Sequence, residues 1–461
     1  MDSFFASDLQ QLNTLYARMQ FSFVFLHGHA GSGQINLVRN FCAGKPALFF
    51  TATENIPSRQ LELFNEEVIS EISQGKFAHK ANSWEQAFTV ISEYSFAHRL
   101  VLVLDEFHLL AQSCPEFMEA FSEAVHHSFV TGKVFLIVLS SNPVFSSEVL
   151  SDTSLPPYDA ITAKAGMGPL PFFTARRALG KYKPLEQILL YGVTGGYPAL
   201  LNRINPSLSA IDNVLNLYFM PSSPMLTQPA DEMHHWLREV STYNFLLEII
   251  ARGNHKLTDI AQIADMGTNK CAKYLNILIQ IDVLKKEIPA IGDVQKRVRY
   301  DFANHMLRFW YRYVFPEMGN IRFGQSKEIW QRKVAPSLSA YLTMVFEDVC
   351  SEYLERLAQA GQTPFVYHRA GSWWRGGTKR EPYFRIPLVA CDPANTVLGV
   401  CHCQDEPADL QYLKELQRPD PTFKDREPYY CIFSTSGFSR ELQDAAKSER
   451  NIWLIDIREM L

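Results

Sequence analysis

The sequence of 461 residues lacks the features of several specialised protein classes. It has no apolar run near the roughly 18 residues that a membrane-spanning helix needs, which argues against a membrane protein. Its first eight residues have no basic start and no apolar core, so no signal peptide is expected. Eight cysteines are too few and too scattered for a disulfide framework. We therefore expect a cytoplasmic protein with free thiols.

A strong charge of either sign is also absent, since 44 Lys+Arg oppose 49 Asp+Glu and the net charge is -5. Hydrophobic residues make up 47% and charged residues 20%, as in globular rather than disordered chains. A mildly acidic total does not exclude nucleic acid as a partner, because one basic domain can be hidden within it.

Short apolar runs alternate with helical lengths over the first 160 residues. The runs lie at 21–26, 47–50, 100–104 and 134–139. Runs of this length and composition are typical of buried parallel strands. The sequence therefore predicts an α/β domain over 1–160, with ligands bound where the strands end at polar turns.

A glycine-rich segment after the first run has the spacing of a Walker A loop, G-x-x-x-x-G-K-[ST]. Backbone N–H groups in such a loop hold phosphates at the positive end of the following helix. Gln34 replaces the Lys that reaches the β- and γ-phosphates, and Ile35 replaces the hydroxyl that ligates Mg²⁺. The loop predicts a site for ATP or ADP. Its candidate residues are Gly28, Gly31, Ser32, Gly33, Gln34 and Ile35.

The run at 100–104 ends in Asp105 and Glu106, the pattern of a Walker B strand. Asp105 is the candidate Mg²⁺ ligand, and Asp105 and Glu106 are the candidate catalytic pair. The alternative is that both carboxylates merely end a strand. Ser141 and Asn142, after the next run, lie where a sensor-like polar residue is expected. Because a neutral Gln34 supplies no charge to a transferring phosphoryl group, we expect nucleotide binding without efficient turnover.

Residues 161–235 have a helical pattern, predicted to form a lid, and 236–318 have three short helices followed by two alternating segments. The second pattern is typical of a winged helix-turn-helix. Lys and Arg there would neutralise DNA phosphates and Asn would contact base edges, although winged helices also serve as interdomain or protein-contact modules. The candidate DNA-binding residues are Asn269, Lys270, Lys273, Arg297 and Arg299, with Asn276, Lys285, Lys286 and Lys296 nearby.

Residues 319–461 predict a small α/β domain, with a helix near 335–358 and strands at 383–389, 397–403, 430–433 and 452–455. Cys401, His402 and Cys403 could suggest zinc. Successive strand residues point to opposite faces, however, so ordinary strand thiols are favoured.

The whole chain resembles the archaeal and bacterial P-loop ATPases of the AAA+/STAND group that carry a nuclease-like C-terminal domain. The matching segments are 5–16, 45–52, 104–107, 195–198 and 307–314, followed in the C-terminal part by 346–348, 373–374, 436–438 and 454–456. The resemblance implies an AAA+-like P-loop domain with a helical lid, a winged helix, and a restriction-endonuclease-like α/β domain of the PD-(D/E)xK type.

The nuclease-like resemblance also implies a metal site that this sequence has largely lost. Pro387 stands at the expected Asp position, and Val400 and His402 stand at the Glu and Lys positions. Only Glu347, on the preceding helix, is kept. DNA cleavage is therefore not expected, and Pro387 predicts a strand edge or a bulge.

Three functions remain open on the sequence alone. The first is a nucleotide-binding regulator or scaffold that contacts DNA or protein. The second is an active ATPase whose missing Lys comes from elsewhere in the chain or from a neighbour. The third is a structural interaction protein that binds no nucleotide.

Overall fold

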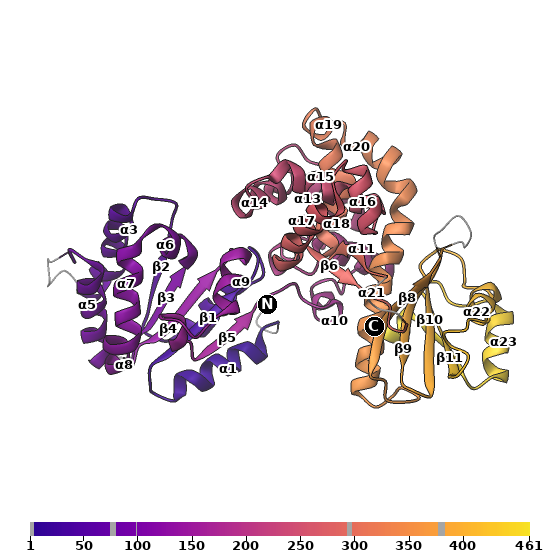
Figure 1. The fold of residues 1–461 in the computed structure, drawn as a ribbon, viewed down its shortest axis with the longest axis horizontal. Helices are drawn as coiled ribbons and strands as arrows, with labels where there is room; N and C mark the ends of the chain where they lie inside the picture. Colours follow the sequence, from indigo (N-terminus) through magenta and orange to yellow (C-terminus); the bar gives the residue numbers. More distant parts are fainter. Residues whose placement is uncertain (1–3, 74–79, 98, 293–296, 377–382) are drawn as a thin grey trace. The chain divides into compact units, whose positions relative to one another are not determined.

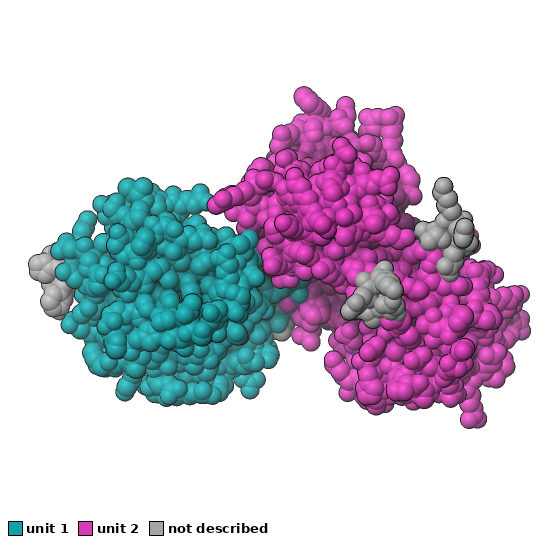
Figure 2. Space-filling view, viewed as in Figure 1, with its two compact units in different colours: residues 1–169, 197–199 teal, residues 170–196, 200–461 magenta. Residues whose placement is uncertain are grey.

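The computed structural model describes residues 4–73, 80–97, 99–292, 297–376 and 383–461. The chain forms two compact units (Figure 2). Unit 1 contains residues 1–169 and 197–199, and unit 2 contains 170–196 and 200–461. Within the described residues, no helix combines the length and the apolar character that crossing a membrane would need.

Unit 1 is built on a parallel five-stranded sheet with the strand order β2-β3-β4-β1-β5. Alternate residues of each strand enter different cores: Phe23 and Phe25 pack on one face of the sheet, and Val24 and Leu26 on the other. Burial on both faces explains the continuous apolar runs in the sequence. The strands are β1 (Ser22–His27), β2 (Ala47–Thr51), β3 (Val101–Asp105), β4 (Phe135–Ser140) and β5 (Ala163–Gly166).

Helices cover both faces of this sheet (Figure 1). Helices α3, α5 and α7 contribute Phe64, Ile91 and Phe121 to one core, and α1 and α2 contribute Leu12 and Leu37 to the other. The helices are α1 (Ala6–Ala17), α2 (Gln34–Cys42), α3 (Pro57–Phe64), α4 (Ser70–Ser73), α5 (Trp84–Ala97), α6 (Phe107–Ser113), α7 (Pro115–Glu123), α8 (Phe129–Gly132) and α9 (Pro143–Ser151).

Strand β5 corrects the prediction that the chain is helical from about 162 onward. Its sequence, Ala-Lys-Ala-Gly, has no apolar run, and it lies at the edge of the sheet, where only β1 pairs with it. An edge strand needs less apolar surface than a central one, so hydrophobic patterning did not reveal it.

Unit 2 begins with helices, and its first two strands, β6 (Leu284–Glu287) and β7 (Arg299–Phe302), form an antiparallel hairpin. Three helices precede the hairpin, as the sequence predicts, and their buried residues include Leu246, Ile260 and Leu275. The helices are α10 (Phe172–Ala175), α11 (Pro184–Thr194), α12 (Pro198–Leu201, shared with unit 1), α13 (Ala210–Tyr218), α14 (Gln228–Trp236), α15 (Val240–Ala251), α16 (Leu257–Ile263), α17 (Thr268–Gln280), α18 (His305–Phe309), α19 (Met318–Arg322) and α20 (Ser326–Ile329).

The C-terminal part of unit 2 has a long helix, α21, followed by a mixed sheet with the order β12-β11-β10-β9-β8. Strands β8, β9 and β10 are antiparallel, whereas β10, β11 and β12 are parallel. Its elements are α21 (Leu338–Gln359), β8 (Arg369–Arg375), β9 (Phe384–Cys391), β10 (Asn395–His402), α22 (Leu410–Leu416), β11 (Glu427–Ser434), α23 (Arg440–Ser448), β12 (Ile452–Asp456) and α24 (Ile457–Met460).

Pro387 lies in β9, which is a central strand rather than an edge. The partner strand β8 shifts register between Gly371 and Trp373, opposite this part of β9. Pairing with β10 ends at Leu388. The proline therefore sits beside a bulge, where its missing N–H leaves no ladder hydrogen bond unmade.

Candidate nucleotide-binding site

The loop between β1 and α2 has a backbone that requires glycine. A Cβ on Gly28 would lie 1.9 Å from the carbonyl oxygen of Met167. Gly33, which precedes α2, has a φ of 100°, and a Cβ there would lie 2.4 Å from the ring of Phe5. Gly31 also has a positive φ, of 81°. The glycines of the predicted phosphate loop are thus needed for the backbone conformation that the loop adopts.

Ser32 places an unsatisfied hydroxyl inside this loop. The residue is 1% exposed, and its Oγ has no hydrogen-bond partner among the described residues. The Oγ lies 3.1 Å from the position of a Cβ on Gly28, so it faces across the loop. Buried hydroxyls are usually hydrogen-bonded, and an unpaired one in a phosphate loop suits a phosphate oxygen as its missing partner.

The two residues at the Walker A Lys and Ser/Thr positions carry no charge. Gln34 is buried, and its Nε2 donates to the carbonyl oxygen of Ser140 at 3.4 Å. Ile35 is 49% exposed and offers no ligand for a cation. The loop keeps its backbone cradle, but these two positions supply no cationic side chain.

Asp105 lies at the carboxyl end of β3, where the backbone N–H of Glu106 donates to it at 2.9 Å and Thr51 Oγ1 at 3.5 Å. Burial raises the pKa of Asp105 to about 6, and the charge of Glu106 adds to this rise. Glu106 has a φ of 51°, in the left-handed region. Such a conformation is uncommon outside glycine and concentrates at functional sites.

Glu106 is held by two neighbours at the same edge of the sheet. Ser141 Oγ donates to Glu106 Oε2 at 2.6 Å, and His108 Nδ1 lies 3.4 Å from the same oxygen. Asn142 instead caps α9, accepting from the N–H of Phe145. Ser141, rather than Asn142, is thus the polar residue after β4 that contacts the Walker B pair.

The strand order puts β4 between the loop and the carboxylates, so Asp105, Glu106 and the loop share one edge. Within the described ranges, no Lys or Arg forms an ion pair with Asp105 or Glu106. Asp105 and Thr51 could contribute oxygen ligands to a Mg²⁺ ion that a nucleotide also holds, although the hydroxyl normally supplied by the loop is replaced by Ile35.

Residues 197–199 complete the surroundings of the loop, which sequence reasoning missed. The N–H of Ala199 donates to the carbonyl oxygen of Gly31 at 3.2 Å. Pro198 Cγ lies 3.4 Å from the Cβ position of Gly33, close to the ring of Phe5. The 195–198 turn was recognised as a motif, but only the tertiary structure brings its end to the phosphate loop.

The structure divides the predicted DNA-binding residues into two groups. Asn269, Lys270 and Lys273 are exposed on α17. Arg297 instead donates to the carbonyl oxygen of Trp374 at 3.1 Å, and Arg299 lies between aromatic rings, 5.6 Å from that of Trp374 and 5.3 Å from that of Tyr383. Of the nearby residues, Asn276 is exposed on α17 and Lys286 lies on β6, whereas Lys296 lies outside the described residues.

The segment after β6 joins the C-terminal sheet. Ala290 and Ile291 belong to the hydrophobic core of that domain, and the N–H of Ala290 donates to Ser372 O at 2.9 Å. The two hairpin arginines are therefore engaged within the chain. Asn269, Lys270 and Lys273 of α17 are exposed, whereas Arg297 is exposed but hydrogen-bonded to Trp374 O, and Arg299 is half-buried.

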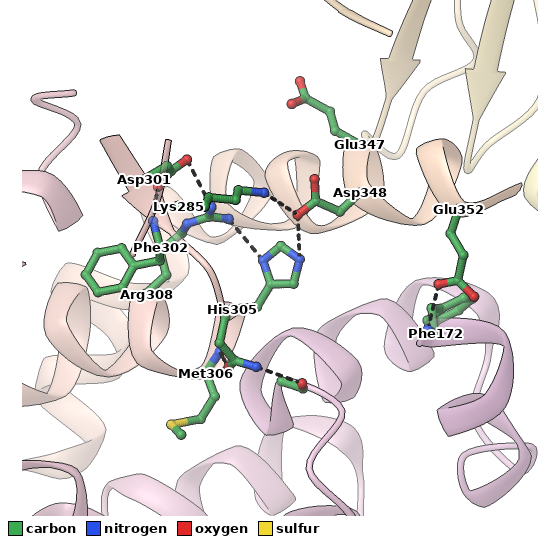
Figure 3. A network of polar contacts seen from close by, with 12 residues as sticks. Phe172, Lys285, Asp301, Phe302, His305, Met306, Arg308, Glu347, Asp348 and Glu352 are labelled. Carbon is green, nitrogen blue, oxygen red and sulfur yellow. Dashed lines mark hydrogen bonds and ion pairs between the residues drawn. The ribbon is translucent and has the colours of Figure 1, made fainter. Parts of the chain in front are cut away.

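An ionic network connects the hairpin to α21 (Figure 3). Asp348 lies 3.7 Å from Lys285 Nζ and 3.1 Å from His305 Nε2, while Arg308 contacts His305 Nδ1 and Asp301, each at 3.0 Å. Burial lowers the pKa of His305, so a neutral ring accepts from Arg308 and donates to Asp348. Burial opposes ionisation of Asp348, but Lys285 and His305 hold its pKa below the ordinary value.

The residue before Asp348 has a different partner. Glu347 points away from the network in Figure 3, and its Oε2 accepts from Arg385 of β9 at 2.6 Å. Burial raises the pKa of Glu347, and Arg385 opposes this rise. The single acid kept from the expected nuclease-like centre is thus neutralised by an arginine of the neighbouring strand.

The predicted zinc alternative finds no support in the geometry. His402 contacts Tyr412 Oη at 2.9 Å and Glu406 O at 2.5 Å through its two ring nitrogens. All eight cysteines are buried and free. In the described parts of the chain, no group of three His, Cys, Asp or Glu side chains is arranged to hold a metal ion.

Two sequence comparisons relate the chain to known proteins. Residues 310–405 match the family DUF234, described as archaea bacterial proteins of unknown function. An uncharacterized protein of Methanocaldococcus jannaschii is 24% identical over 374 residues, which cover 80% of this chain and 81% of that protein.

Among solved structures, a Walker-type ATPase of Pyrococcus abyssi aligns with a TM-score of 0.51 at 13% identity, over 68% of this chain and 96% of that one. The ORC2 protein of Aeropyrum pernix aligns with a TM-score of 0.45 at 13% identity, over 70% of this chain and 95% of that one. The first likeness supports the coarser part of the predicted fold, an α/β structure with a parallel sheet that is similar to the fold of this Walker-type ATPase.

Proposed function

We propose that the protein binds a nucleotide at its phosphate loop and acts as a regulator rather than as an ATPase. The observation that carries this proposal is Ser32: its buried hydroxyl lacks a partner inside a loop that keeps its glycine-dependent backbone. Phosphate oxygens would accept from this hydroxyl and from the N–H groups at the start of α2. Phe5 and Pro198 would offer apolar surface beside the phosphates.

Turnover is not favoured by the same geometry. Gln34 carries no charge and is hydrogen-bonded to Ser140, so it does not stabilise charge on a transferring phosphoryl group. Glu106, the residue that would polarise water, already accepts from Ser141 Oγ, and His108 Nδ1 lies 3.4 Å from the same oxygen. An active ATPase would need a cation from another chain or another part of this one.

The route from the nucleotide to the rest of the chain would be residues 195–199. Ala199 is hydrogen-bonded to the phosphate loop, and four residues earlier the carbonyl oxygen of Gly195 accepts from Asn304 Nδ2 at 3.0 Å. Asn304 directly precedes His305 of the ionic network in unit 2. A nucleotide that shifts residues 197–199 would therefore change the conformation of the 195–196 turn, to which Asn304 is hydrogen-bonded.

Two outputs are proposed for such a regulator. The exposed residues of α17 favour contact with DNA, through Lys270 and Lys273 to phosphates and through Asn269 to a base edge. The three helices and the hairpin would then form a winged helix that uses its third helix, while the hairpin connects to the C-terminal sheet. A protein partner is the alternative output. The C-terminal sheet, proposed to be nuclease-like in topology, would serve as a scaffold.

Calorimetric titration with ADP and ATP, with and without Mg²⁺, tests the proposal. We expect saturable binding that survives chelation of Mg²⁺ and no release of phosphate from ATP. The double variant Gln34→Lys/Ile35→Thr is the positive control, because it restores the two missing side chains and should create or raise turnover.

The other functions predict different results. Phosphate release by the wild type that Glu106→Gln abolishes would establish an active ATPase. An absence of binding up to millimolar ADP and ATP would leave a structural protein that takes no nucleotide.

A further inference from the structure

We infer that the phosphate loop binds nucleoside diphosphates in preference to triphosphates. This inference rests on the proposed nucleotide site and names the ligand that the site selects. The reason is charge. The loop would hold the phosphates of a nucleotide as far as the β-phosphate, whereas a γ-phosphate would lie near the Asp105 and Glu106 carboxylates with no Lys or Arg to offset their charge.

The cradle itself carries no charge penalty for a diphosphate. The positive end of α2 and the backbone N–H groups of the loop are neutral donors that favour an anion. Ser32 Oγ adds a buried donor with no partner of its own. These groups are fixed by the glycine conformations and by Ala199, whose N–H is bonded to Gly31 O.

The region beyond the cradle is acidic. In a conventional P-loop the γ-phosphate meets a Lys and a Mg²⁺ ion, and the Mg²⁺ offsets the Walker B carboxylate. Here Gln34 donates to Ser140 O, at the end of the strand that lies between the loop and β3. Asp105 and Glu106 keep their positions, so a third phosphoryl group would be brought toward two carboxylates.

The neighbours of these carboxylates do not restore the missing charge. Ser141 and Thr51 are neutral donors to Glu106 and Asp105. His108 Nδ1 lies 3.4 Å from Glu106 Oε2, and no Lys or Arg of the described residues pairs with either carboxylate. A single histidine replaces neither a Lys nor a divalent ion at neutral pH.

Titration of the full chain with AMP, ADP and ATP, and with GDP and GTP, tests this preference. The titrations are done in chelator and again with Mg²⁺. We expect the diphosphate to bind at least about tenfold more tightly than its triphosphate in chelator, because an added like charge near an unscreened carboxylate is costly. Gln34→Lys should reduce this ratio about tenfold, whereas the uncharged Gln34→Met is the matched control and should leave it unchanged.

Each other outcome is decisive. Equal or tighter binding of the triphosphate overturns the preference and leaves the nucleotide site intact. AMP binding as tight as that of ADP shows that the β-phosphate is not held, which also overturns it. A ratio that survives both Gln34→Lys and Asp105→Asn refutes the charge explanation. Absence of binding by all five ligands contradicts the nucleotide site itself.

Discussion

The candidate phosphate loop of unit 1 and the surroundings of Glu347 in the C-terminal part of unit 2 differ in whether their polar groups have partners within the chain. In the loop, Gln34 and Ile35 stand where a Walker A motif has Lys and Ser/Thr, and the buried hydroxyl of Ser32 has no hydrogen-bond partner within the described residues. In the C-terminal part, the largely buried carboxylate of Glu347 is paired with Arg385 at 2.6 Å. The first arrangement leaves a hydrogen-bond donor, Ser32, available to an anion. In the second, Arg385 already neutralises the Glu347 carboxylate.

This difference separates loss of catalysis from loss of binding. The loop keeps conformations that require glycine. Glycine loses more conformational entropy on folding than alanine would, so these residues lower the stability of the fold. In the C-terminal sheet, an internal guanidinium occupies the neighbourhood of the acid that a metal would have needed. Unit 1 therefore keeps an unpaired buried donor at Ser32, whereas Glu347 of the C-terminal part is paired with an internal cation.

Removing the guanidinium of Arg385, which pairs with Glu347, should have the largest effect on stability. Arg385→Ala leaves the Glu347 carboxylate buried and unpaired, and we expect a loss of about 3 kcal/mol in unfolding free energy. Hydrogen exchange of the β9 and β10 amides would measure the loss locally. Lys447→Ala breaks the exposed pair with Asp444 and is the control, with an expected change below about 0.5 kcal/mol. Full rescue of Arg385→Ala by Mg²⁺ would show that the centre remains a metal site.

The two units should respond to acid in opposite directions. Burial raises the pKa of Asp105 to about 6, above an unfolded value near ~3.9, so its stabilisation is present at low pH and is lost as the pH rises through about 6. Burial lowers the pKa of His305 and of His255, so their stabilisation is full above ~6.5 and is lost as the pH falls.

Lowering the pH from 7.5 to 5.5 should therefore raise the local stability of β3 by about 1 kcal/mol. It should lower the local stability of α18, which contains His305, and of the segment before α16, which contains His255, by up to about 1.4 kcal/mol each. Hydrogen exchange at both pH values, in chelator, distinguishes the two regions. Asp105→Asn should remove the gain in unit 1, and His305→Gln should reduce the loss in unit 2. A parallel response of both units would contradict the contrast.

The sequence predicted the elements better than it predicted the state of either centre. The runs at 21–26 and 134–139 became β1 and β4 because burial on both faces leaves a continuous apolar pattern. The same analysis identified the missing Lys at Gln34, but not its bond to Ser140, which is 106 residues away. Contacts over such distances depend on strand order, which no local pattern encodes.

Similar reasoning explains the hairpin and the C-terminal centre. Arg297 and Arg299 matched a DNA-binding pattern, yet their guanidinium groups meet Trp374 and Tyr383. Residue type predicted charge, while the partner of that charge was set by packing between the hairpin and the sheet. Arg385 was overlooked for the same reason, since only the position of β9 beside α21 brings it to Glu347.

Removing the unpaired hydroxyl of Ser32 from the candidate nucleotide site should have a smaller effect, on the affinity for ADP. Ser32→Ala should weaken ADP binding about tenfold, the value of one hydrogen bond to a charged group, without lowering the stability of the free protein. Ser22→Ala is a matched control, because Ser22 Oγ is also buried and unpartnered but lies at the opposite end of β1. Isothermal titration and thermal unfolding of both variants measure the two quantities. An equal loss of affinity in Ser22→Ala would show that the effect is not local.

The smallest expected effect distinguishes Lys273, which is exposed on α17, from Arg297, which is hydrogen-bonded to Trp374 O. If α17 contacts DNA, Lys273→Ala should reduce the slope of log affinity against log salt by about 1, the contribution of one phosphate contact. Arg297→Ala should leave this slope unchanged, since Arg297 is bonded to Trp374 O, and should instead increase hydrogen exchange in β8. Fluorescence anisotropy of a labelled duplex across a salt series measures both slopes. A reduced slope in Arg297→Ala with an unchanged slope in Lys273→Ala would transfer the DNA contact from the helix to the hairpin, because a phosphate contact reports only the side chain that makes it.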